Sequence, residues 1–467
     1  MIIKNLKNPT HRSRWIAAIA AVAAAPLLLA GCTADAAPDL PAGEVGGKLT
    51  YWFAMESTDD ESVAQMRETY VDPFEALYPN VTVDLIPQAD EGATAKVQTA
   101  LAAGQGPDFI ETAGSATAIP FAEAGYLADL GPLAEKEGWK DTMFPWAMDM
   151  GVIDGKLVAM PVTYETLVLY YNKTLFDEHG WEVPTDRASL ESLAEEMEDA
   201  GVTPFTAGNA DYFGATEWQL SAYLNQVAGP GAIHDALAGE IPFTDDVFVD
   251  SVQMMVDDFQ NGWYGGGVKQ YFSTTDPQKY AKFANGDAGM FISGSWELFA
   301  LNEYFGESNS DWAWAPLPPM ASGVPSDVCP LSVGGTMSIN AASKNIPAAE
   351  AYVKWMFSDI DARWNAIETI GDLPLPVAFD PADVPESIDP RFTEQYTAIS
   401  DASLAENVGY VTWTSFGGAQ EAYILENVDR LLTGDLSAKD FCKALDEAYQ
   451  KDAAAGVIPP LFDTSAR

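Results

Sequence analysis

Cysteine and histidine are scarce in this chain of 467 residues, which contains three of each. Zinc sites of ordinary ligand spacing and histidine-dependent catalytic triads need clusters of these side chains. His179 and His234 are instead isolated along the sequence. A glycine-rich phosphate loop of the P-loop type is missing as well. We therefore expect neither a metal nor a cofactor, and we exclude zinc chemistry and P-loop nucleotide hydrolysis.

Basic residues are few, because 24 Lys and Arg stand against 69 Asp and Glu and give a formal net charge of -45. Nucleic acid and anionic lipid surfaces are poor partners for so acidic a protein. The acidic residues are dispersed among apolar ones, a pattern typical of a solvated surface that aids solubility.

Beyond the N-terminal region, the sequence lacks any apolar run of about eighteen residues, the length that a membrane-spanning helix needs. Hydrophobic residues nevertheless make up 48% of the chain and aromatic residues 11%. A chain of this length and composition has enough apolar material for two cores and is too long for one ordinary domain.

The N-terminus has the order of a bacterial lipoprotein signal. Four basic residues and no acidic one precede residue 15, residues 15–29 are apolar and rich in Ala, and a Leu-Ala-Gly-Cys tetrapeptide ends at Cys32. The apolar stretch suits a signal peptide and is too short to span a membrane. We predict that residues 1–31 are removed and that lipidated Cys32 anchors the protein to the outer face of the cytoplasmic membrane. Residues 32–47, which are small, polar or turn-forming, would be a flexible tether.

Two further cysteines, Cys329 and Cys442, remain once Cys32 is lipidated. An oxidising exterior would let them form a disulfide, but nothing in the sequence fixes the distance between them. The pairing is therefore left open at this point.

Short apolar strands alternate with amphipathic helices along the chain. Residues 49–53 and 81–85 have strand character and flank a helical stretch over 63–77. A second helix over 93–103 leads into a strand at 108–110. This alternation predicts an α/β fold with parallel strand pairs.

Later segments predict a further core helix and several joints. Residues 347–358 form a helical pattern with few charges, and its aromatic residues, including Trp355, are expected in the core. Joints rich in Pro or Gly occur at 160–161, 316–319 and 371–376. Three joints indicate that the chain passes three times between two domains.

Several segments, taken in order, resemble the extracellular solute-binding proteins of carbohydrate ABC transporters, the maltose-binding-protein-like class. The resemblance spans nearly the whole chain after the tether. It rests on seven segments: Phe74–Val81, Gly106–Asp108, Gly125–Leu130, Asp154–Pro161, Leu169–Lys173, Phe283–Met290 and Gly294–Trp296.

That resemblance implies a two-lobe fold of type II, in which each lobe is a mainly parallel sheet flanked by helices. A ligand cleft lies between the lobes, and three hinge crossings join them. Lobe one would hold residues 48–161 and 319–373, and lobe two residues 162–318 and 374–467. The implied protein is a monomeric binder rather than an enzyme, and it delivers a sugar or oligosaccharide to membrane permease subunits.

A sugar site needs aromatic rings for the C–H faces of the ligand and carboxylates or amides for its hydroxyls. The resemblance places a stacking aromatic at Trp296, where a strand passes into a helix. It places a hydroxyl-binding acid at Glu165, just past the first joint, with Tyr164 beside it.

Further ligand-binding candidates are less directly aligned with the family. Trp218 follows Glu217 at the start of a helix, with Asn209 upstream, and Trp413 lies in a Thr-rich loop. A Gly pair ending at Gly335 could bring backbone amides close to a ligand. Ser115 is a further candidate. After Gly106–Asp108 the sequence departs from polysaccharide-binding relatives, because residues Glu111–Ser115 are small and polar, which leaves the length and identity of the sugar open.

Two other functions remain as alternatives. A lipid-anchored glycoside hydrolase would use two carboxyl groups as acid and as base or nucleophile. A binder of polyamines or other cations with the same fold would enclose an amine between aromatic rings and pair it with acids.

Overall fold

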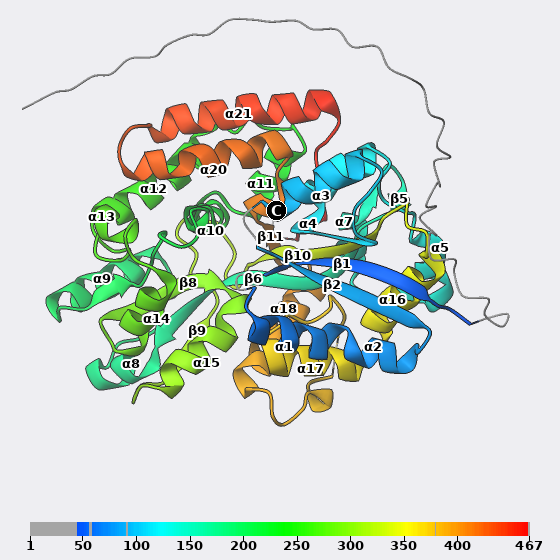
Figure 1. The fold of residues 1–467 in the computed structure, drawn as a ribbon. Coiled ribbons are helices and arrows are strands. Elements are labelled where there is room, and N and C mark those ends of the chain that lie inside the picture. Colours follow the sequence, from blue (N-terminus) through cyan, green and yellow to red (C-terminus); the bar gives the residue numbers. More distant parts are fainter. Residues whose placement is uncertain (1–43, 56–57, 90–91, 379, 466–467) are drawn as a thin grey trace, which may run out of the picture. The chain divides into compact units, whose positions relative to one another are not determined.

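The computed structural model describes residues 44–55, 58–89, 92–378 and 380–465. The predicted signal peptide and Cys32 lie outside the described residues, as does the tether up to residue 43. Within the described part, nine strands form one sheet in the order β2, β1, β3, β10, β6, β8, β7, with β11 beside β10 and β9 beside β6 (Figure 1). These strands are β1 (Gly47–Met55), β2 (Val81–Ala89), β3 (Phe109–Thr112), β6 (Met160–Asn172), β7 (Thr203–Phe205), β8 (Ala288–Gly294), β9 (Trp312–Ala315), β10 (Cys329–Ile339) and β11 (Val408–Tyr410).

Helices flank this sheet, and a small hairpin pairs β4 (Val152–Ile153) with β5 (Lys156–Leu157). The first helices are α1 (Asp60–Tyr70), α2 (Asp72–Leu77), α3 (Ala93–Ala102), α4 (Gly114–Glu123), α5 (Gly131–Glu137), α6 (Trp139–Thr142), α7 (Pro145–Met150), α8 (Lys173–His179) and α9 (Arg187–Asp199). The middle of the chain holds α10 (Ala215–Tyr223), the π-helix η1 (Leu224–Ala228), α11 (Pro230–Leu237), α12 (Asp246–Gln260), α13 (Val268–Tyr271), α14 (Asp276–Ala284), the 3-10 helix η2 (Ser295–Glu297) and α15 (Leu298–Gly306). The last are α16 (Ile346–Ser358), α17 (Ile360–Ile370), η3 (Pro381–Asp383), α18 (Pro390–Leu404), α19 (Thr412–Ser415), α20 (Gly418–Leu432) and α21 (Ala438–Ala455).

The strand and helix predictions for the first part of the chain are confirmed. β1 and β2 pair in parallel from Gly47 with Val81 onward, and α1 and α2 lie between them in the chain. In Figure 1, α2 and α16 lie against β2 and β1, while α4 packs on β3 and β10 from the opposite side. Helices therefore cover both faces of this part of the sheet, as expected for an α/β fold.

The sheet is more mixed than the predicted mainly parallel arrangement. β1 pairs with β2 and β3 in parallel, but β10 runs antiparallel to β3 and β6, and β6 runs antiparallel to β8 and β9. β6 takes part in three of these antiparallel pairs, because its first half pairs with β10 and its second half pairs with β8 and β9. β6 thus joins the half of the sheet that contains β10 to the half that contains β8.

An irregularity in β10 lies opposite β6. The register with β6 shifts between Ser332 and Gly335, which is the signature of a bulge. A Cβ atom on Gly334 would lie 2.5 Å from Oε2 of Glu165, so only Gly allows the backbone to approach that carboxylate.

Buried apolar residues of the described chain form two large clusters. One draws on residues 49–162 and 337–375, and the other on 144–333 and 364–462. Trp355 is 4% exposed in the first cluster, which confirms its predicted place in the core. Two cores of this kind are what the length and composition predicted.

The disulfide left open above does not form, because Cys329 and Cys442 are both free cysteines. Cys329 begins β10 and its thiol interacts with Thr166, whereas Cys442 is buried on α21 near Tyr423. Burial raises the pKa of both thiols to about 12, which keeps them in the unreactive protonated form.

Across residues 44–465, apart from the short gaps given above, every helix is too short or too polar to cross a membrane.

Candidate functional site

Four aromatic side chains, which we call the aromatic cluster, come together from three separate parts of the chain. They are Tyr212, Trp218, Trp296 and Trp413. Trp218 stacks on Tyr212 with ring centroids 5.4 Å apart and meets Trp296 edge-on at 5.3 Å. Trp296 in turn meets Trp413 edge-on at 6.2 Å. Three of the predicted site residues therefore share one surface.

Local structure fixes the position of Trp296. β8 ends at Gly294, and η2 then turns the chain into α15, so Trp296 leaves the end of a buried strand as predicted. A Cβ atom on Gly294 would lie only 2.0 Å from the Trp296 ring, so the indole lies directly against this glycine backbone. Any larger residue at 294 would displace the ring.

The aromatic cluster is partly open to solvent. Tyr212 is 43% exposed and its neighbour Phe213 is 63% exposed, while the three tryptophans are half-buried. Exposed aromatic rings are uncommon on a soluble surface unless they meet a ligand or partner. These rings can stack on the C–H faces of a small molecule.

Glu165, which is part of β6, contacts Trp413 of α19. Its Oε1 accepts hydrogen bonds from Oγ of Ser332 at 3.1 Å and from Nε1 of Trp413 at 3.2 Å. Burial raises the pKa of Glu165 to about 7, and these two hydrogen bonds oppose the rise. Two of the predicted site residues, Glu165 and Trp413, are thus joined by a hydrogen bond.

Two more carboxylates, Glu217 on α10 and Glu421 on α20, lie close to Tyr212. Burial, and then the charge of Glu421, raise the pKa of Glu217 to about 8, while a 3.3 Å hydrogen bond from Oγ1 of Thr412 opposes this. Burial alone raises the pKa of Glu421 to about 7. After burial, the charges of Glu217, Glu421 and Glu165 each raise the pKa of the Tyr212 phenol, so the three carboxylates act on this ring through their charge.

Two predicted residues lie next to this surface. A Cβ atom on Gly335 would be 3.4 Å from Oγ1 of Thr163, so Gly335 borders the segment that carries Glu165. Tyr164 is fully buried, packs edge-on against Phe144 and Tyr396, and supports β6 from behind.

The structure does not bring Ser115 and Asn209 into contact with the aromatic cluster. Ser115 is fully buried and its hydroxyl donates to the backbone carbonyl of Met150. Nδ2 of Asn209 donates to Asp429 at 2.9 Å. The Ser115 hydroxyl therefore has a protein partner, whereas Oδ1 of Asn209 is buried with no hydrogen-bond partner among the described residues.

Sequence reasoning missed Tyr212 and Glu421. Tyr212 lies in a segment that did not align securely, and its exposure beside Phe213 is visible only in the structure. Glu421 is one of 69 acidic residues, and its position in the sequence gives no signal that its charge acts on Tyr212.

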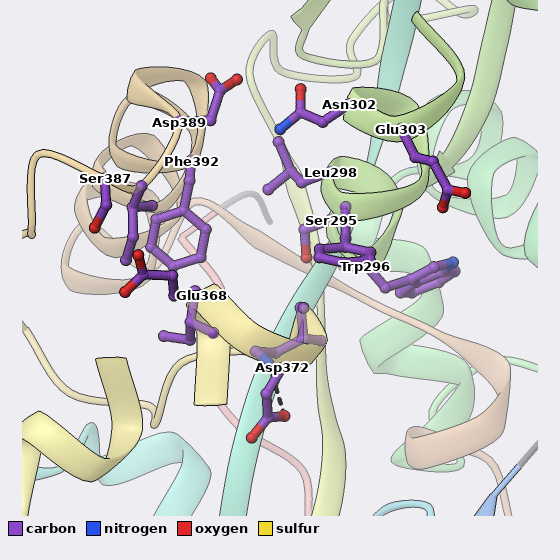
Figure 2. A pocket seen from close by; sticks show the side chains of 15 residues that line it. Ser295, Trp296, Leu298, Asn302, Glu303, Glu368, Asp372, Ser387, Asp389 and Phe392 are labelled. Atoms are coloured by element: carbon purple, nitrogen blue, oxygen red, sulfur yellow. Dashed lines mark hydrogen bonds between the residues drawn. The ribbon is translucent and has the colours of Figure 1, made fainter. Parts of the chain in front are cut away.

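A pocket of about 430 Å³ borders the aromatic cluster at Trp296. Figure 2 shows Phe392, Leu298 and Asn302 around this pocket, with the Trp296 indole turned away from Phe392. Its walls come from α15, α17 and α18 and include acidic side chains: Glu303, Glu368, Asp372 and Asp389. Trp296 thus separates the pocket from the other three rings.

Over the described ranges, no group of three or more His, Cys, Asp or Glu side chains could hold a metal ion. Aromatic rings beside hydrogen-bonding carboxylates are instead suited to binding an organic molecule that carries hydroxyl or amino groups.

Comparison with known proteins gives two curated relatives and a solved structure of interest. The chain is 27% identical over 247 residues to the maltodextrin-binding protein MdxE of Bacillus subtilis, an alignment covering 51% of this chain and 54% of that protein. It is 25% identical to the multiple sugar-binding protein of Streptococcus mutans, over 61% of this chain and 66% of that protein. The matched regions thus span about half to two thirds of these relatives.

The fold is similar to that of a solved chitin oligosaccharide binding protein, with a TM-score of 0.73, 19% identity, and coverage of 88% of this chain and 99% of the other. Identity at this level supports the fold alone. The family model for bacterial extracellular solute-binding proteins matches residues 56–362, which is more than half of the 467 residues. The chain therefore belongs to the bacterial extracellular solute-binding proteins.

Proposed function

We propose that this protein is the substrate-binding component of an ABC importer and that it captures a sugar or oligosaccharide outside the cytoplasmic membrane. The observation that carries this proposal is the aromatic cluster beside Glu165, Glu217 and Glu421. Rings and carboxylates are the two kinds of group that the two surfaces of a sugar require. Membrane permease subunits would receive the sugar from the protein, which would act as a monomer.

Two lobes would close around the sugar. Their proposed boundaries are 48–161 with 319–373 for lobe one and 162–318 with 374–467 for lobe two. Hinge closure of this kind converts binding into a shape that a permease can recognise. The aromatic cluster and Glu165 would be on the surface that becomes enclosed.

Sugar binding should raise the melting temperature and reduce the radius of gyration without chemical change. A ligand that binds only the native state stabilises it by RT ln(1 + [L]/Kd), which is about 2.7 kcal/mol at a hundredfold excess over Kd. A thermal-shift screen of mono- and oligosaccharides identifies the sugar, and small-angle scattering with and without it measures closure. Because the family consists of binding proteins, mass spectrometry should recover the sugar intact. Cleaved oligosaccharide that disappears with one carboxylate variant would support the glycoside hydrolase instead.

The N-terminal sequence supports a lipid anchor at Cys32. Two or more acyl chains hold a protein stably on a membrane, whereas one chain holds it only reversibly. Expression of Cys32→Ala in a bacterial host should therefore shift the protein from the detergent phase to the aqueous phase. Equal partitioning of Cys32→Ala and the wild-type protein would contradict the anchor. A variant starting at Lys48 should fold and bind sugar, because every residue of the proposed site follows Lys48 in the sequence.

A further inference from the structure

We infer that Ser332 is a positioning residue for sugar binding, because its hydroxyl holds Oε1 of Glu165 against the Trp413 indole and so leaves Oε2 of Glu165 for a hydroxyl of the ligand. This inference rests on the proposed function and deepens it, since Ser332 is not one of the residues that the sequence placed in the site. Three observations support it: the hydrogen bonds of Ser332, the unbonded second oxygen of Glu165, and the irregular backbone of β10.

Ser332 connects two site residues through three hydrogen bonds that form a closed set. Its Oγ donates to Oε1 of Glu165 at 3.1 Å and accepts from Nε1 of Trp413 at 3.0 Å. The same Nε1 also donates to Oε1 of Glu165 at 3.2 Å, so the indole N–H is shared between two oxygens. A serine hydroxyl can donate and accept at once, and Ser332 does both here. Each of the three groups is therefore held by the other two.

These hydrogen bonds are buried and rest on paired strands. Ser332 is 1% exposed and Glu165 is 8% exposed. The two residues lie directly opposite each other in the register of β10 and β6, which puts their side chains on the same face of the sheet. A hydrogen bond is stronger in such surroundings than in water, and removal of one partner leaves the other unsatisfied. The backbone of two neighbouring strands thus fixes the Ser332 hydroxyl against the carboxylate.

The second oxygen of Glu165, Oε2, remains for a ligand. Both hydrogen bonds that this carboxylate accepts from side chains of the described residues end at Oε1. Oε2 is not one of the buried side-chain oxygens that lack a partner, so it reaches the surface of the site. An ionised carboxylate oxygen only accepts hydrogen bonds, so its partner must be a donor. A sugar hydroxyl is such a donor.

The backbone of β10 makes room for this arrangement. Its register with β6 shifts between Ser332 and Gly335, which marks a bulge. A Cβ atom on Gly334 would lie 2.5 Å from Oε2 of Glu165, so any side chain at 334 would push the carboxylate aside. Ser332 and Gly334 thus act on the two oxygens of one carboxylate. Ser332 holds Oε1, and Gly334 leaves space for Oε2.

The nuclear magnetic resonance signal of the Trp413 indole N–H tests the positioning without any ligand. In protein whose tryptophans carry a nitrogen isotope label, the signal that disappears in Trp413→Phe belongs to Trp413. Ser332→Ala removes one of the two acceptors of this N–H, so the Trp413 signal should shift more than any other tryptophan signal. Ser338→Ala is the matched control, because Ser338 is also on β10 and its buried hydroxyl has no hydrogen-bond partner among the described residues. It should leave the Trp413 signal unchanged.

Calorimetry with the sugar found in the thermal-shift screen measures the effect on binding. Ser332→Ala should weaken sugar binding about tenfold, the scale of one hydrogen bond to a charged group. Ser332→Cys has nearly the same volume but only a weak donor, so it should show a similar loss without leaving a cavity, and it serves in place of Ser332→Ala if that variant does not fold. Gly334→Ala, which crowds Oε2 of Glu165, should also weaken binding. Ser338→Ala should bind as tightly as the wild type.

The outcomes separate this inference from the proposed function. A wild-type protein that binds none of the sugars would overturn the proposed function, and the role of Ser332 in binding with it. Sugar binding that the wild type shows and both Ser332 variants retain in full would overturn the inference alone. An unmoved Trp413 signal in Ser332→Ala also contradicts the inference. So do equal losses of binding in Ser332→Ala and Ser338→Ala, because the hydroxyl would then matter only for the packing of β10.

Discussion

Replacing Trp296 with Ala is expected to weaken saccharide binding at least about tenfold. Loss of a central aromatic anchor commonly costs about 2 kcal/mol or more, and about 1.4 kcal/mol corresponds to tenfold in Kd. Trp296 is the ring that contacts both Trp218 and Trp413, so its removal also separates the remaining rings. Isothermal titration calorimetry with the sugar found in the screen measures the loss. Because Trp296 is only half-buried, the ligand-free protein should melt within a few degrees of the wild type.

Trp355→Ala is the contrasting control for the same chemical change. Trp355 is 4% exposed and packs against Phe74 and Tyr352, so its removal leaves a cavity in the core. The expected cost is about 3 to 5 kcal/mol of unfolding free energy. The folded fraction of this variant should bind sugar normally. If Trp296→Ala bound normally but melted as early as Trp355→Ala, then Trp296 would be a core residue and the assigned site would be wrong.

The position of Trp296 could be predicted because it depends on the succession of elements over a few neighbouring residues. A strand, a glycine and a helix start follow one another at Gly294, and the structure has the ring against that glycine. The strands at 49–53 and 81–85 were predictable for the same reason, since their apolar pattern is contained in a few residues. Helix α16 differs from its predicted range only at its first residue.

Contacts between distant parts of the chain could not be predicted in this way. Trp413 donates to Glu165 across 248 positions, and the charge of Glu421 on α20 raises the pKa of Tyr212, which precedes α10. The sequence shows that each residue can donate or accept, but only tertiary packing decides which pairs meet. Cys329 and Cys442 illustrate the same limit, because two cysteines in one chain need not be neighbours.

The mixed pairing of the sheet also escaped prediction. Sequence patterns indicate strands, but their direction depends on which strands become neighbours. β6 is 13 residues long and pairs with different partners along its two halves, and one of them, β10, comes from a part of the chain more than 150 positions later. The resemblance to a known family predicted the α/β fold with two lobes, but it did not predict whether each pair of neighbouring strands is parallel or antiparallel.

Glu217→Gln is expected to stabilise the ligand-free protein at alkaline pH. The folded protein raises the pKa of Glu217 to about 8, far above its ordinary value of 4.5. Between these values, the folded state holds a proton that the unfolded state has lost, so stability falls as the pH rises. This contribution is fully present below about pH 4.5 and is lost as the pH passes through about 8. Each pKa unit is worth about 1.4 kcal/mol, so the total is on the order of 5 kcal/mol.

An uncharged Gln avoids this loss, so Glu217→Gln should match the wild type near pH 5 and exceed its unfolding free energy by about 2 to 4 kcal/mol near pH 9. Urea unfolding at several pH values measures the difference, with the exposed Glu426→Gln as the matched control, which should show no such pH-dependent gain. The gain should accompany weaker ligand binding, because a site that holds an unpaired acid for its ligand trades stability for function. A Glu217→Gln protein that is less stable than wild type near pH 9 would show that the native carboxylate is ionised and held by donors. Burial of a proton-bearing acid at this site would then be wrong.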